Sequence, residues 1–244
     1  MADWFKDWFS SDYYLSVYSH RNDDDADEFL NNILKYIPLA KGSKVLDAAC
    51  GSGRHSIVMA QKGFNVTAFD LSIPLLNVAV ADTRVLNLDV KYFNSDLRFV
   101  PLKEKFKIIL NLFTSFGYFE DDEENFAFIN SSYSMLEKNG YFVFDYFNSG
   151  YLRNNLVIES EKCINGLKIL EKRKISENRI LKNITIEKEG IKSNFEESVH
   201  LYSSGEILNK FSAIGFKVVN IFGGYDCTQF SLNNSDRLII IFQK

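Results

Sequence analysis

Three aspartates occupy similar places in the first hundred residues, each at or near the end of a short apolar run. Asp47 lies in VLDAACGSGRH, Asp70 ends NVTAFD, and Asp96 lies in NSDLR. Carboxylates accept hydrogen bonds from hydroxyl and amino groups, and they attract positive charge. A row of such acids could therefore hold one ligand that carries hydroxyls and a cationic group.

The first of these segments runs from apolar residues into Gly51-Ser-Gly53. Glycine has no Cβ, so a ligand can approach the backbone there, and a helix that follows presents unpaired N–H groups. A dinucleotide-binding turn would read G-x-G-x-x-G, but Ser56 replaces the third glycine. Asp47, just before the turn, would repel a phosphate and attract an ammonium or a sulfonium. The turn therefore favours a ligand that is positive at this point.

The other two acids suggest the rest of the ligand. Asp70 follows the turn by about 20 residues, where a carboxylate in nucleotide-binding α/β folds accepts hydrogen bonds from ribose hydroxyls. Asp96 could accept from an adenine amino group, with the Leu97 N–H facing a ring nitrogen. Three acids after three successive strands describe a ribose with adenine on one side and a cationic group on the other.

These residues can meet only if the fold brings the ends of several strands together. The periodicity of the apolar residues predicts such a fold. Strands are predicted at residues 44–48, 65–70, 90–93, 106–112, 141–146, 216–221 and 238–242. Helices are predicted at residues 27–37, 54–62, 73–86, 121–136 and 206–214. Alternating strands and helices predict an α/β fold with a mostly parallel sheet that is covered on both faces.

Residues 156–202 follow a different pattern. The runs KILEKRKI, RILKNITIE and SVHLYS alternate apolar with polar residues, which indicates exposed antiparallel strands. We interpret this block as an insert in one domain that is formed by residues 1–155 and 203–244. The insert would serve as a substrate lid or as a dimer contact, because an exposed strand edge can pair with a second copy.

Composition limits the functional classes. The 244 residues, 46% of them hydrophobic, suffice for one large core. A net charge of −4 without a basic block disfavours nucleic-acid binding. No window approaches the roughly 20 apolar residues of a membrane helix, and MADWFKDWFSSDYY has no signal-peptide run, so a cytoplasmic location is predicted. No Cys/His cluster indicates a metal site.

Taken in order, VLDAACGSGRH, FDLS, NSDLR and NLFTSFGYF resemble the motifs of class I S-adenosylmethionine-dependent methyltransferases. The resemblance covers essentially the whole chain. It is nearest to small bacterial methyltransferases that begin with a segment like YYLSVYSHR and end near GGYD and SDRLIIIFQK, many of which have no assigned substrate. It implies a Rossmann-like sheet of seven strands with the last strand inserted antiparallel, and S-adenosylmethionine as cofactor. The antiparallel β segment predicted from the pattern of residues 156–202 would then be an insert after strand 5.

The resemblance also implies a cofactor site. The matching positions are Asp47, Ala49, Gly51, Gly53, Asp70, Leu71, Asp96, Leu97, Asn111, Leu112 and Phe113. The residues of the glycine turn would face the methionine and ribose part, and Asp47 would act near the amino group. Asp70 would hold the ribose, with Leu71 against the adenine. The residues after the fourth strand would lie beside the sulfonium.

Two residues before the first predicted helix would close over the methionine end in this family. These are Tyr18 and Arg21, and Arg21 could pair with the carboxylate through two hydrogen bonds. Each has an ordinary alternative, which is packing of an N-terminal helix for Tyr18 and a solvated surface charge for Arg21.

The methyl acceptor would lie between the aromatic N-terminal segment, residues 114–119 and the entrance of the insert. The predicted substrate-binding residues are Tyr14, Phe116, Tyr118, Tyr146, Asn148 and Tyr225. So many aromatic side chains indicate a small, partly apolar acceptor. The alternative for the N-terminal aromatics is an amphipathic helix that packs on the domain.

Methyl transfer from a sulfonium is an in-line displacement, and an amine or thiol that arrives deprotonated needs no base. We therefore assign no catalytic residue, although Tyr118, Tyr146 and His200 are candidates for a base if the acceptor is a hydroxyl. An N-P-P-Y motif is missing after the fourth strand, which disfavours DNA or protein-amide methylation. The predicted function is methyl transfer to a small molecule. The alternatives are a non-catalytic cofactor-binding interaction module and a Rossmann-type oxidoreductase.

Overall fold

Strands and helices alternate along the first part of the chain, and four consecutive strands follow in its second half. The structure is a computed structural model that describes residues 4–18 and 23–244. Its helices are α1 (Trp4–Phe9), α2 (Tyr14–Val17), α3 (Asp23–Leu34), α4 (Arg54–Gln61), α5 (Ile73–Val85), α6 (Asp122–Met135), α7 (Ser149–Asn154) and α8 (Ser204–Ile214). Its strands are β1 (Lys44–Ala48), β2 (Asn65–Asp70), β3 (Val90–Asn94), β4 (Phe106–Asn111), β5 (Leu136–Phe147), β6 (Glu159–Ile164), β7 (Leu167–Ser176), β8 (Arg179–Lys188), β9 (Ile191–His200), β10 (Lys217–Phe222) and β11 (Arg237–Gln243).

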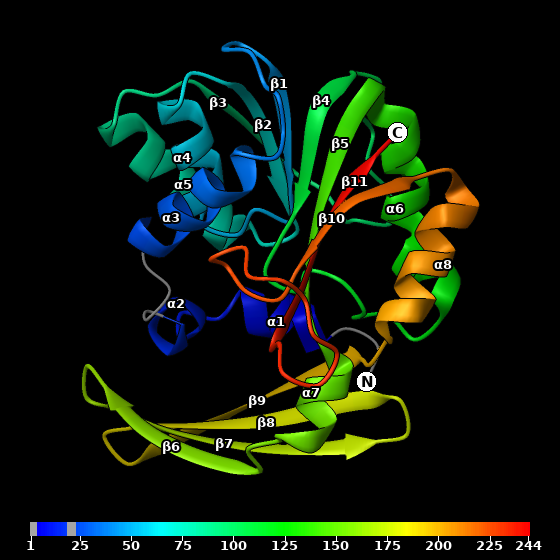
Figure 1. The fold of residues 1–244 in the computed structure, drawn as a ribbon. Coiled ribbons are helices and arrows are strands. Elements are labelled where there is room, and N and C mark those ends of the chain that lie inside the picture. Colours follow the sequence, from blue (N-terminus) through cyan, green and yellow to red (C-terminus); the bar gives the residue numbers. More distant parts are fainter. Residues whose placement is uncertain (1–3, 19–22) are drawn as a thin grey trace.

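The main sheet has seven strands in the order β10-β11-β5-β4-β1-β2-β3 (Figure 1). Strand β11 is antiparallel to both of its neighbours, β5 and β10, and the pairs from β5 to β3 are all parallel. The predicted Rossmann-like sheet with its last strand inserted antiparallel is confirmed. Because β1, β2 and β3 are parallel neighbours, their carboxyl ends meet at one edge of the sheet.

Both faces of this sheet are buried, and β11 shows how its sequence serves both. Ile239 and Ile241 pack in the cluster that includes α3 and α4, whereas Ile240 and Phe242 pack in the cluster that includes α6 and α8. Successive strand side chains point to opposite faces, so an unbroken apolar run suits a strand that is covered on both sides. Figure 1 shows α3, α4 and α5 on one side of the sheet and α6 and α8 on the other.

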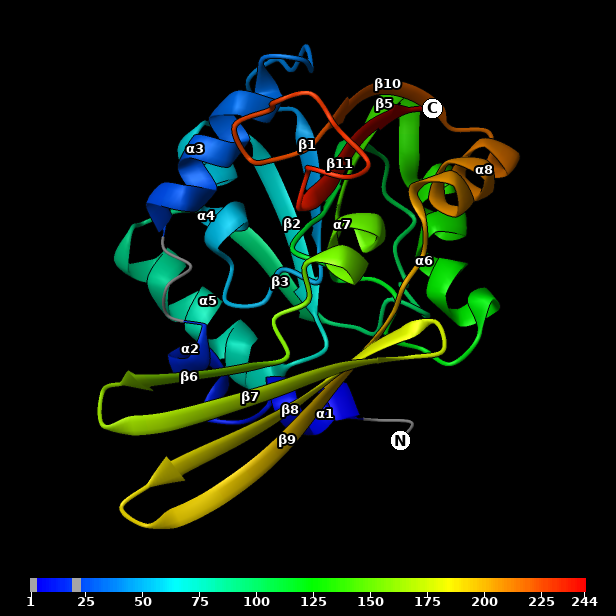
Figure 2. The ribbon, with the colours of Figure 1, turned by 60° about the horizontal axis from the view of Figure 1, so that its bottom comes forward.

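A second sheet of four antiparallel strands, β6-β7-β8-β9, lies across one end of the main sheet (Figure 2). Its strands fall within residues 156–202, which the sequence assigned to an insert after strand 5. Trp8 of α1 and Val17 of α2 pack on this sheet, against a set of buried side chains that comprises Leu167, Ile169, Ile184 and Ile186. The N-terminal helices therefore lie between the two sheets.

Several boundaries differ from the prediction. Helix α3 begins at Asp23, earlier than predicted. Helix α6 passes directly into β5 at Leu136, so that β5 begins five residues before the predicted strand at 141–146. Helix α7 was not predicted, because six residues are too few for a periodic pattern.

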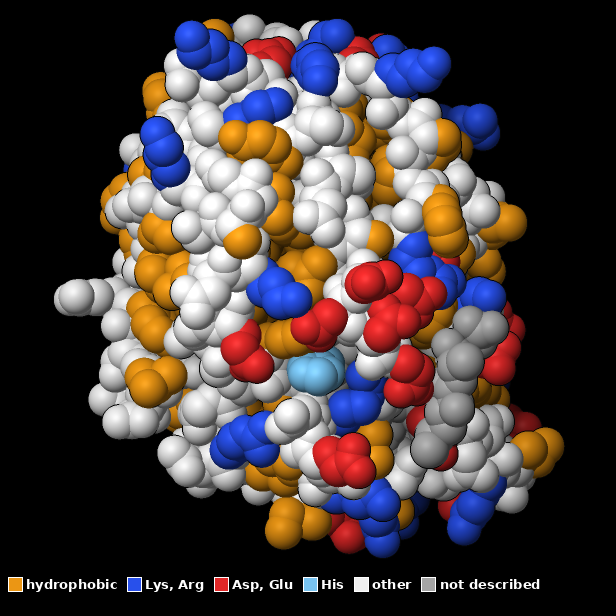
Figure 3. All heavy atoms as spheres, turned by 90° about the vertical axis from the view of Figure 1, so that its right-hand side faces the viewer, with side chains coloured by type: hydrophobic (Ala, Val, Ile, Leu, Met, Phe, Trp, Pro, Cys, Tyr) orange, Lys and Arg blue, Asp and Glu red, His pale blue; other side chains and the backbone are white. Residues whose placement is uncertain are grey.

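Two surface properties bear on the expected partners. Within the described residues, no helix is both long enough and apolar enough to cross a membrane. On the face that carries α6 and α8, acidic and basic side chains are intermixed, with no continuous basic field (Figure 3). The absence of nucleic-acid binding, the homodimer and the division into a domain and an insert all stay predictions.

Candidate functional site

The turn after β1 is built from residues with left-handed backbone. Ala49 has φ 58° and Gly51 has φ 57°, and Gly53, with φ 82°, precedes α4. A Cβ added to Gly51 would meet no atom within 4 Å, so its Cα faces open space. A Cβ added to Gly53 would lie 2.8 Å from the Ala79 Cβ. Gly51 thus leaves room for a ligand, whereas Gly53 allows close packing on α5.

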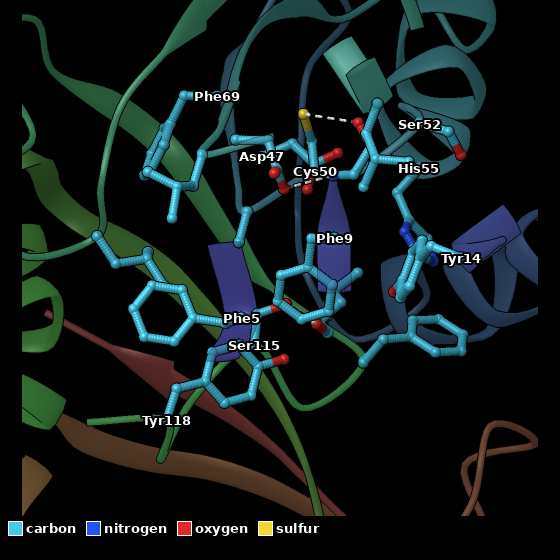
Figure 4. Close-up of a pocket in the computed structure, with 18 of the residues that line it drawn as sticks. Phe5, Phe9, Tyr14, Asp47, Cys50, Ser52, His55, Phe69, Ser115 and Tyr118 are labelled. Atoms are coloured by element: carbon cyan, nitrogen blue, oxygen red, sulfur yellow. Dashed lines mark hydrogen bonds between the residues drawn. The ribbon is translucent and has the colours of Figure 1, made fainter. Parts of the chain in front are cut away.

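A cavity of about 260 Å³ lies beside this turn (Figure 4). We call it the first cavity. Of the predicted cofactor-binding residues, it is lined by Tyr18, Asp47, Ala49, Gly51, Asp70, Leu71, Asp96, Leu97, Leu112 and Phe113. In Figure 4, Asp47 and Cys50 lie on one side of the space, and Phe9 and Tyr118 lie on the other.

Two backbone N–H groups hold the carboxylate of Asp70 in place. Its Oδ2 accepts a 2.8 Å hydrogen bond from the Gly51 N–H, and its Oδ1 accepts one of 2.8 Å from the Ser72 N–H. Burial raises the pKa of Asp70, and these hydrogen bonds oppose that shift. Since each carboxylate oxygen has a second lone pair, Asp70 can still accept hydrogen bonds from a ligand in the cavity.

Asp96 is held by Arg98. The Arg98 Nη2 lies 2.8 Å from Oδ2 of Asp96, and its Nε lies 3.1 Å from Oδ1. Burial alone would raise the pKa of Asp96, but the hydrogen bonds from Arg98 outweigh it and the pKa is lowered. The Arg98 guanidinium also lies 4.4 Å from the ring centre of Phe119, a residue of the cavity wall. Asp96 is thus an ionised acid of fixed orientation at the end of β3.

Asp47 is the most deeply buried acid of the row, with 2% of its surface exposed. Its Oδ2 accepts a 2.5 Å hydrogen bond from Ser56 Oγ, on the first turns of α4. Burial raises the pKa of Asp47 to about 6, although the Ser56 hydrogen bond opposes the shift. A cationic ligand beside Asp47 would favour its ionised form.

Two predicted cofactor residues do not line the first cavity. Gly53 packs against α5 as described, and the Asn111 side chain donates to the carbonyl oxygens of Ala48 (3.3 Å) and Ser115 (3.4 Å). Asn111 therefore ties β4 to β1, and the residues that reach the cavity from β4 are the next two, Leu112 and Phe113. Arg21 lies outside the described residues.

Tyr18 lines the first cavity, but its hydroxyl is directed to the second sheet. The hydroxyl donates to Glu197, which also accepts a 2.7 Å hydrogen bond from Trp8 Nε1. Lys182 lies 2.8 Å from the same carboxylate. Glu197 and Lys182 thus fasten both N-terminal helices to β8 and β9.

A second cavity, of about 1070 Å³, adjoins the first and shares five aromatic residues with it. These are Phe9, Tyr14, Tyr18, Phe113 and Tyr118. Its walls are the main domain on one side and the second sheet on the other. Tyr14, Tyr118 and Tyr225, which were predicted to bind the acceptor, all line it, and Tyr225 stacks on Phe113 with ring centroids 5.2 Å apart.

Three other predicted acceptor residues line neither of these cavities, and each has a structural role. Phe116 packs in the core against Phe144. Tyr146 is fully buried, and its hydroxyl donates to the His200 carbonyl. Asn148 caps α7 and donates to carbonyl oxygens of the loop before β11, including Leu232 at 2.8 Å. Their side chains point into the fold and not into these cavities, so their role in acceptor binding stays a prediction that this geometry does not support.

The candidate bases also differ in whether they line a cavity. Tyr118 is in the cavity walls, whereas Tyr146 is in the core. His200 lines neither cavity. Its ring stacks on Tyr202 with centroids 4.0 Å apart, and its N–H donates to Gly117 O at 2.7 Å.

A buried ion pair that was not predicted from the sequence shapes the loop after β4. Arg237 Nη2 lies 2.6 Å from Oδ1 of Asp145, whose side chain is completely buried. Oδ2 of Asp145 accepts a 2.8 Å hydrogen bond from the Phe113 N–H, and the Asp145 carbonyl accepts one from the Thr114 N–H. Phe113 and Thr114 both have positive φ, and these bonds hold them there. One charged residue in each of two apolar strands, YFVFDYF and RLIIIFQ, was the available signal.

Arg179, on β8, was also missed. Its guanidinium donates to the carbonyl oxygens of Phe119 (2.9 Å) and Tyr118 (3.0 Å), and its Nε donates to Ser198 Oγ at 2.7 Å. The second sheet thereby holds the loop that places Tyr118 between the two cavities.

Two features of the first cavity fit the adenosyl sulfonium that the sequence implies. The open space over the Gly51 Cα would admit a ligand against bare backbone. The buried Nε2 atom of His55, another wall residue, has no hydrogen-bond partner within the described structure. A buried polar atom without a partner is expected where a polar ligand completes a site.

Comparison with known proteins agrees with this geometry. Residues 45–140 match the family model of a methyltransferase domain. The glycine/sarcosine N-methyltransferase of Aphanothece halophytica is 31% identical over 104 residues, which are 42% of this chain and 39% of that protein. The matched segment spans less than half the length of such curated relatives.

Solved structures resemble the whole fold. A S-adenosylmethionine-dependent methyltransferase from Clostridium acetobutylicum superposes with a TM-score of 0.80 at 16% identity, over 95% of each chain. The S-adenosylmethionine-bound amino pentose methyltransferase CalS10 from Micromonospora echinaspora has a TM-score of 0.70 at 17% identity, over 96% of this chain and 97% of that one. Because 95% or more of this chain is covered, most of the second sheet belongs to the shared architecture.

Proposed function

We propose that this chain, which carries a class I S-adenosylmethionine-dependent methyltransferase domain over residues 45–140, transfers a methyl group to the amine of a small molecule. S-adenosylmethionine is the cofactor of this domain. The observation that carries the proposal is the row of Asp47, Asp70 and Asp96 along one wall of the first cavity, which adjoins a second and larger cavity. The first would take the cofactor and the second the acceptor.

The residues of the first cavity suit the parts of the cofactor in order. Asp96 and the Leu97 N–H would contact the adenine edge, with Leu71 against its face. Asp70 would accept from the ribose hydroxyls. Asp47 would face the ammonium of the methionine part. The reasons are the fixed carboxylates of Asp70 and Asp96 and the burial of Asp47, each at the end of a neighbouring strand.

When bound, the cofactor would supply an electrophilic methyl group on its sulfonium; the acceptor nitrogen would bond to the methyl carbon as the carbon–sulfur bond breaks, which would leave S-adenosylhomocysteine. The chain's part is to align the acceptor and to stabilise positive charge. Phe113, Tyr118 and Tyr14 line both cavities, so their rings border the passage between donor and acceptor. Asp145 and Arg237 hold Phe113 in place through its backbone.

The charges of the second cavity favour an amine. Within the described structure, its acids on the second sheet already pair with cations, since Glu197 pairs with Lys182 and Glu171 with Arg173. Three exposed acids on the main domain, Glu28, Asp226 and Asp236, form no ion pair there. They would attract a cationic amine, and an amine that arrives deprotonated needs no dedicated base. The relatives named for glycine, sarcosine and an amino pentose support the same class.

The test is turnover with matched acceptors. The whole chain is incubated with S-adenosylmethionine and with pairs of small amines and their hydroxyl analogues, and mass spectrometry records the gain of one methyl. We expect methylated amines together with S-adenosylhomocysteine. Methylation of the hydroxyl partners alone would contradict the amine assignment. Tight cofactor binding without turnover of any acceptor would contradict methyl transfer and favour the non-catalytic alternative.

A pair of variants tests whether the exposed acids of the second cavity attract the amine. Asp236→Asn removes one exposed charge from the second cavity, so the KM for an amine should rise severalfold while the affinity for the cofactor stays unchanged. Asp82→Asn removes another exposed charge, on α5 and outside both cavities, and should change neither the KM nor the affinity for the cofactor. Equal effects of the two substitutions would contradict a role for the exposed acids of the second cavity in attracting the amine.

A further inference from the structure

His55 is a buried titratable residue that neither the sequence analysis nor the proposed mechanism uses. It is the second residue of α4, and 6% of its surface is exposed. It lines the first cavity (Figure 4). Its ring lies 5.1 Å from the Phe113 ring and 6.4 Å from the Phe29 ring, centroid to centroid, so aromatic neighbours fix its position.

The Nε2 atom of His55 has no hydrogen-bond partner within the part of the chain that the structure describes, although it is buried. Such an atom loses its hydrogen bonds to water and gains none in return, which costs stability. Burial, together with the charge of Arg54, lowers the pKa of His55 to about 3, so the imidazole is neutral in ordinary buffers. A neutral imidazole can carry its proton on Nε2 and donate it to a ligand.

The place of His55 in the first cavity identifies the part of the ligand that it faces. The acids follow the strand order β3, β2, β1, from the proposed adenine position to the proposed ammonium position. Strand β4 comes next in the sheet, and Phe113, two residues after its end, contacts His55. His55 therefore lies at the end of the row that would receive the methionine part.

This end already has an acid for the ammonium group, which is Asp47. Arg54, beside His55 in sequence, also lines the cavity, and its guanidinium lies 5.2 Å from the Phe113 ring centre. A donor next to a cation suits an anionic group and opposes a second ammonium. We propose that His55 binds the cofactor by donating its Nε2–H to the methionine carboxylate, an inference that rests on the proposed function.

The test compares two ligands that differ in that carboxylate alone. Calorimetry is performed with S-adenosylmethionine and with decarboxylated S-adenosylmethionine on the wild type, His55→Leu and His55→Gln. The leucine variant should bind S-adenosylmethionine about tenfold or more weakly, as expected for a lost hydrogen bond to a charged group. Its affinity for the decarboxylated ligand should change less than about twofold. Gln, which keeps a donor, should restore most of the affinity for S-adenosylmethionine.

The outcomes separate this inference from the proposed function. A wild type that binds neither ligand overturns both. A wild type that binds S-adenosylmethionine, with a leucine variant that binds it equally well, overturns only the role of His55. Equal weakening of both ligands also overturns it, because that result indicates packing. If the leucine variant does not fold, ¹⁵N NMR of the wild-type imidazole decides: S-adenosylmethionine should shift the His55 Nε2 resonance and the decarboxylated ligand should not, and equal shifts would overturn the inference.

Discussion

The N–H of Gly51 donates a 2.8 Å hydrogen bond to Oδ2 of Asp70, which joins the glycine turn after β1 to the acid that ends β2. The two strands are parallel neighbours, with Ala48 opposite Phe69 in register. The turn and the acid therefore form one hydrogen-bonded part of the wall of the first cavity, which is in place before a ligand binds. Such preorganisation lowers the entropic cost of binding.

The two glycines of the turn should respond differently to alanine, because one faces the cavity and the other faces α5. Gly51→Ala adds a methyl in open space at φ 57°, so the free energy of unfolding should fall by only about 1 kcal/mol. The same methyl enters the first cavity, and the affinity for S-adenosylhomocysteine should fall about tenfold or more, measured by calorimetry.

Gly53→Ala is the matched comparison. Its Cβ would lie 2.7 Å from the Tyr92 hydroxyl and 2.8 Å from the Ala79 Cβ, at φ 82°. Overpacking and backbone strain together should lower the free energy of unfolding by about 3 kcal/mol in urea titrations. The folded fraction should bind the ligand nearly as well as the wild type. Similar stabilities and similar affinities for the two variants would show that the glycines are not specialised in this way.

Asp47 should make the stability of the ligand-free protein fall as pH rises. Its pKa is about 6 in the folded chain, chiefly because of burial, against 3.8 as the ordinary value. The folded state binds the proton more tightly, so the contribution is complete below about pH 4 and is lost as pH rises through 6. The loss amounts to about 3 kcal/mol at about 1.4 kcal/mol per pH unit.

Comparison with a variant separates the contribution of Asp47 from the contributions of all other titratable groups. The free energy of unfolding of the wild type minus that of Asp47→Asn is followed by urea titration from pH 4 to pH 7. This difference should decrease steadily with pH. A difference that stays constant would mean that Asp47 has an ordinary pKa in the folded chain, and one that increases would mean that its pKa is lowered; either result would contradict the prediction.

The ion pair of Asp145 and Arg237 should couple stability to the loop that carries Phe113. Removing one partner of a buried pair leaves the other charge without compensation, so Asp145→Leu and Arg237→Leu should each lower the free energy of unfolding by about 3 kcal/mol. The double variant should lose clearly less than the sum of the two single losses, by more than about 1 kcal/mol in a double-mutant cycle. Additive losses would indicate two independent contributions.

The row of acids could be predicted from the sequence because the position of each acid follows from a local sequence pattern. Asp47, Asp70 and Asp96 each end or follow an apolar run, and the carboxyl ends of parallel strands meet at one edge. The seven-stranded sheet with its last strand inserted antiparallel followed from the resemblance of the motifs. Strand boundaries shifted by a few residues without moving the acids.

Other residues depend on contacts that local patterns do not contain. The G-x-G spacing does not tell that Gly53 faces Ala79, since that depends on how α5 packs. Tyr146 enters the core because β5 pairs with β4 and β11 on its two sides, and of the β5 side chains only Phe147, at the end of the strand, lines one of the two cavities. Asp145 and Arg237 are 92 residues apart, and only the insertion of β11 beside β5 brings them together.

The most direct test of the account is calorimetry with S-adenosylhomocysteine on the wild type, on Asp70→Ala and on the surface control Asp82→Ala. Loss of hydrogen bonds between a charged group and the ribose should weaken binding by about 2 kcal/mol, or about thirtyfold, in Asp70→Ala. The control should bind like the wild type. An Asp70→Ala variant that is folded and binds with unchanged affinity would contradict the ribose position, and with it the placement of the cofactor along the row of acids.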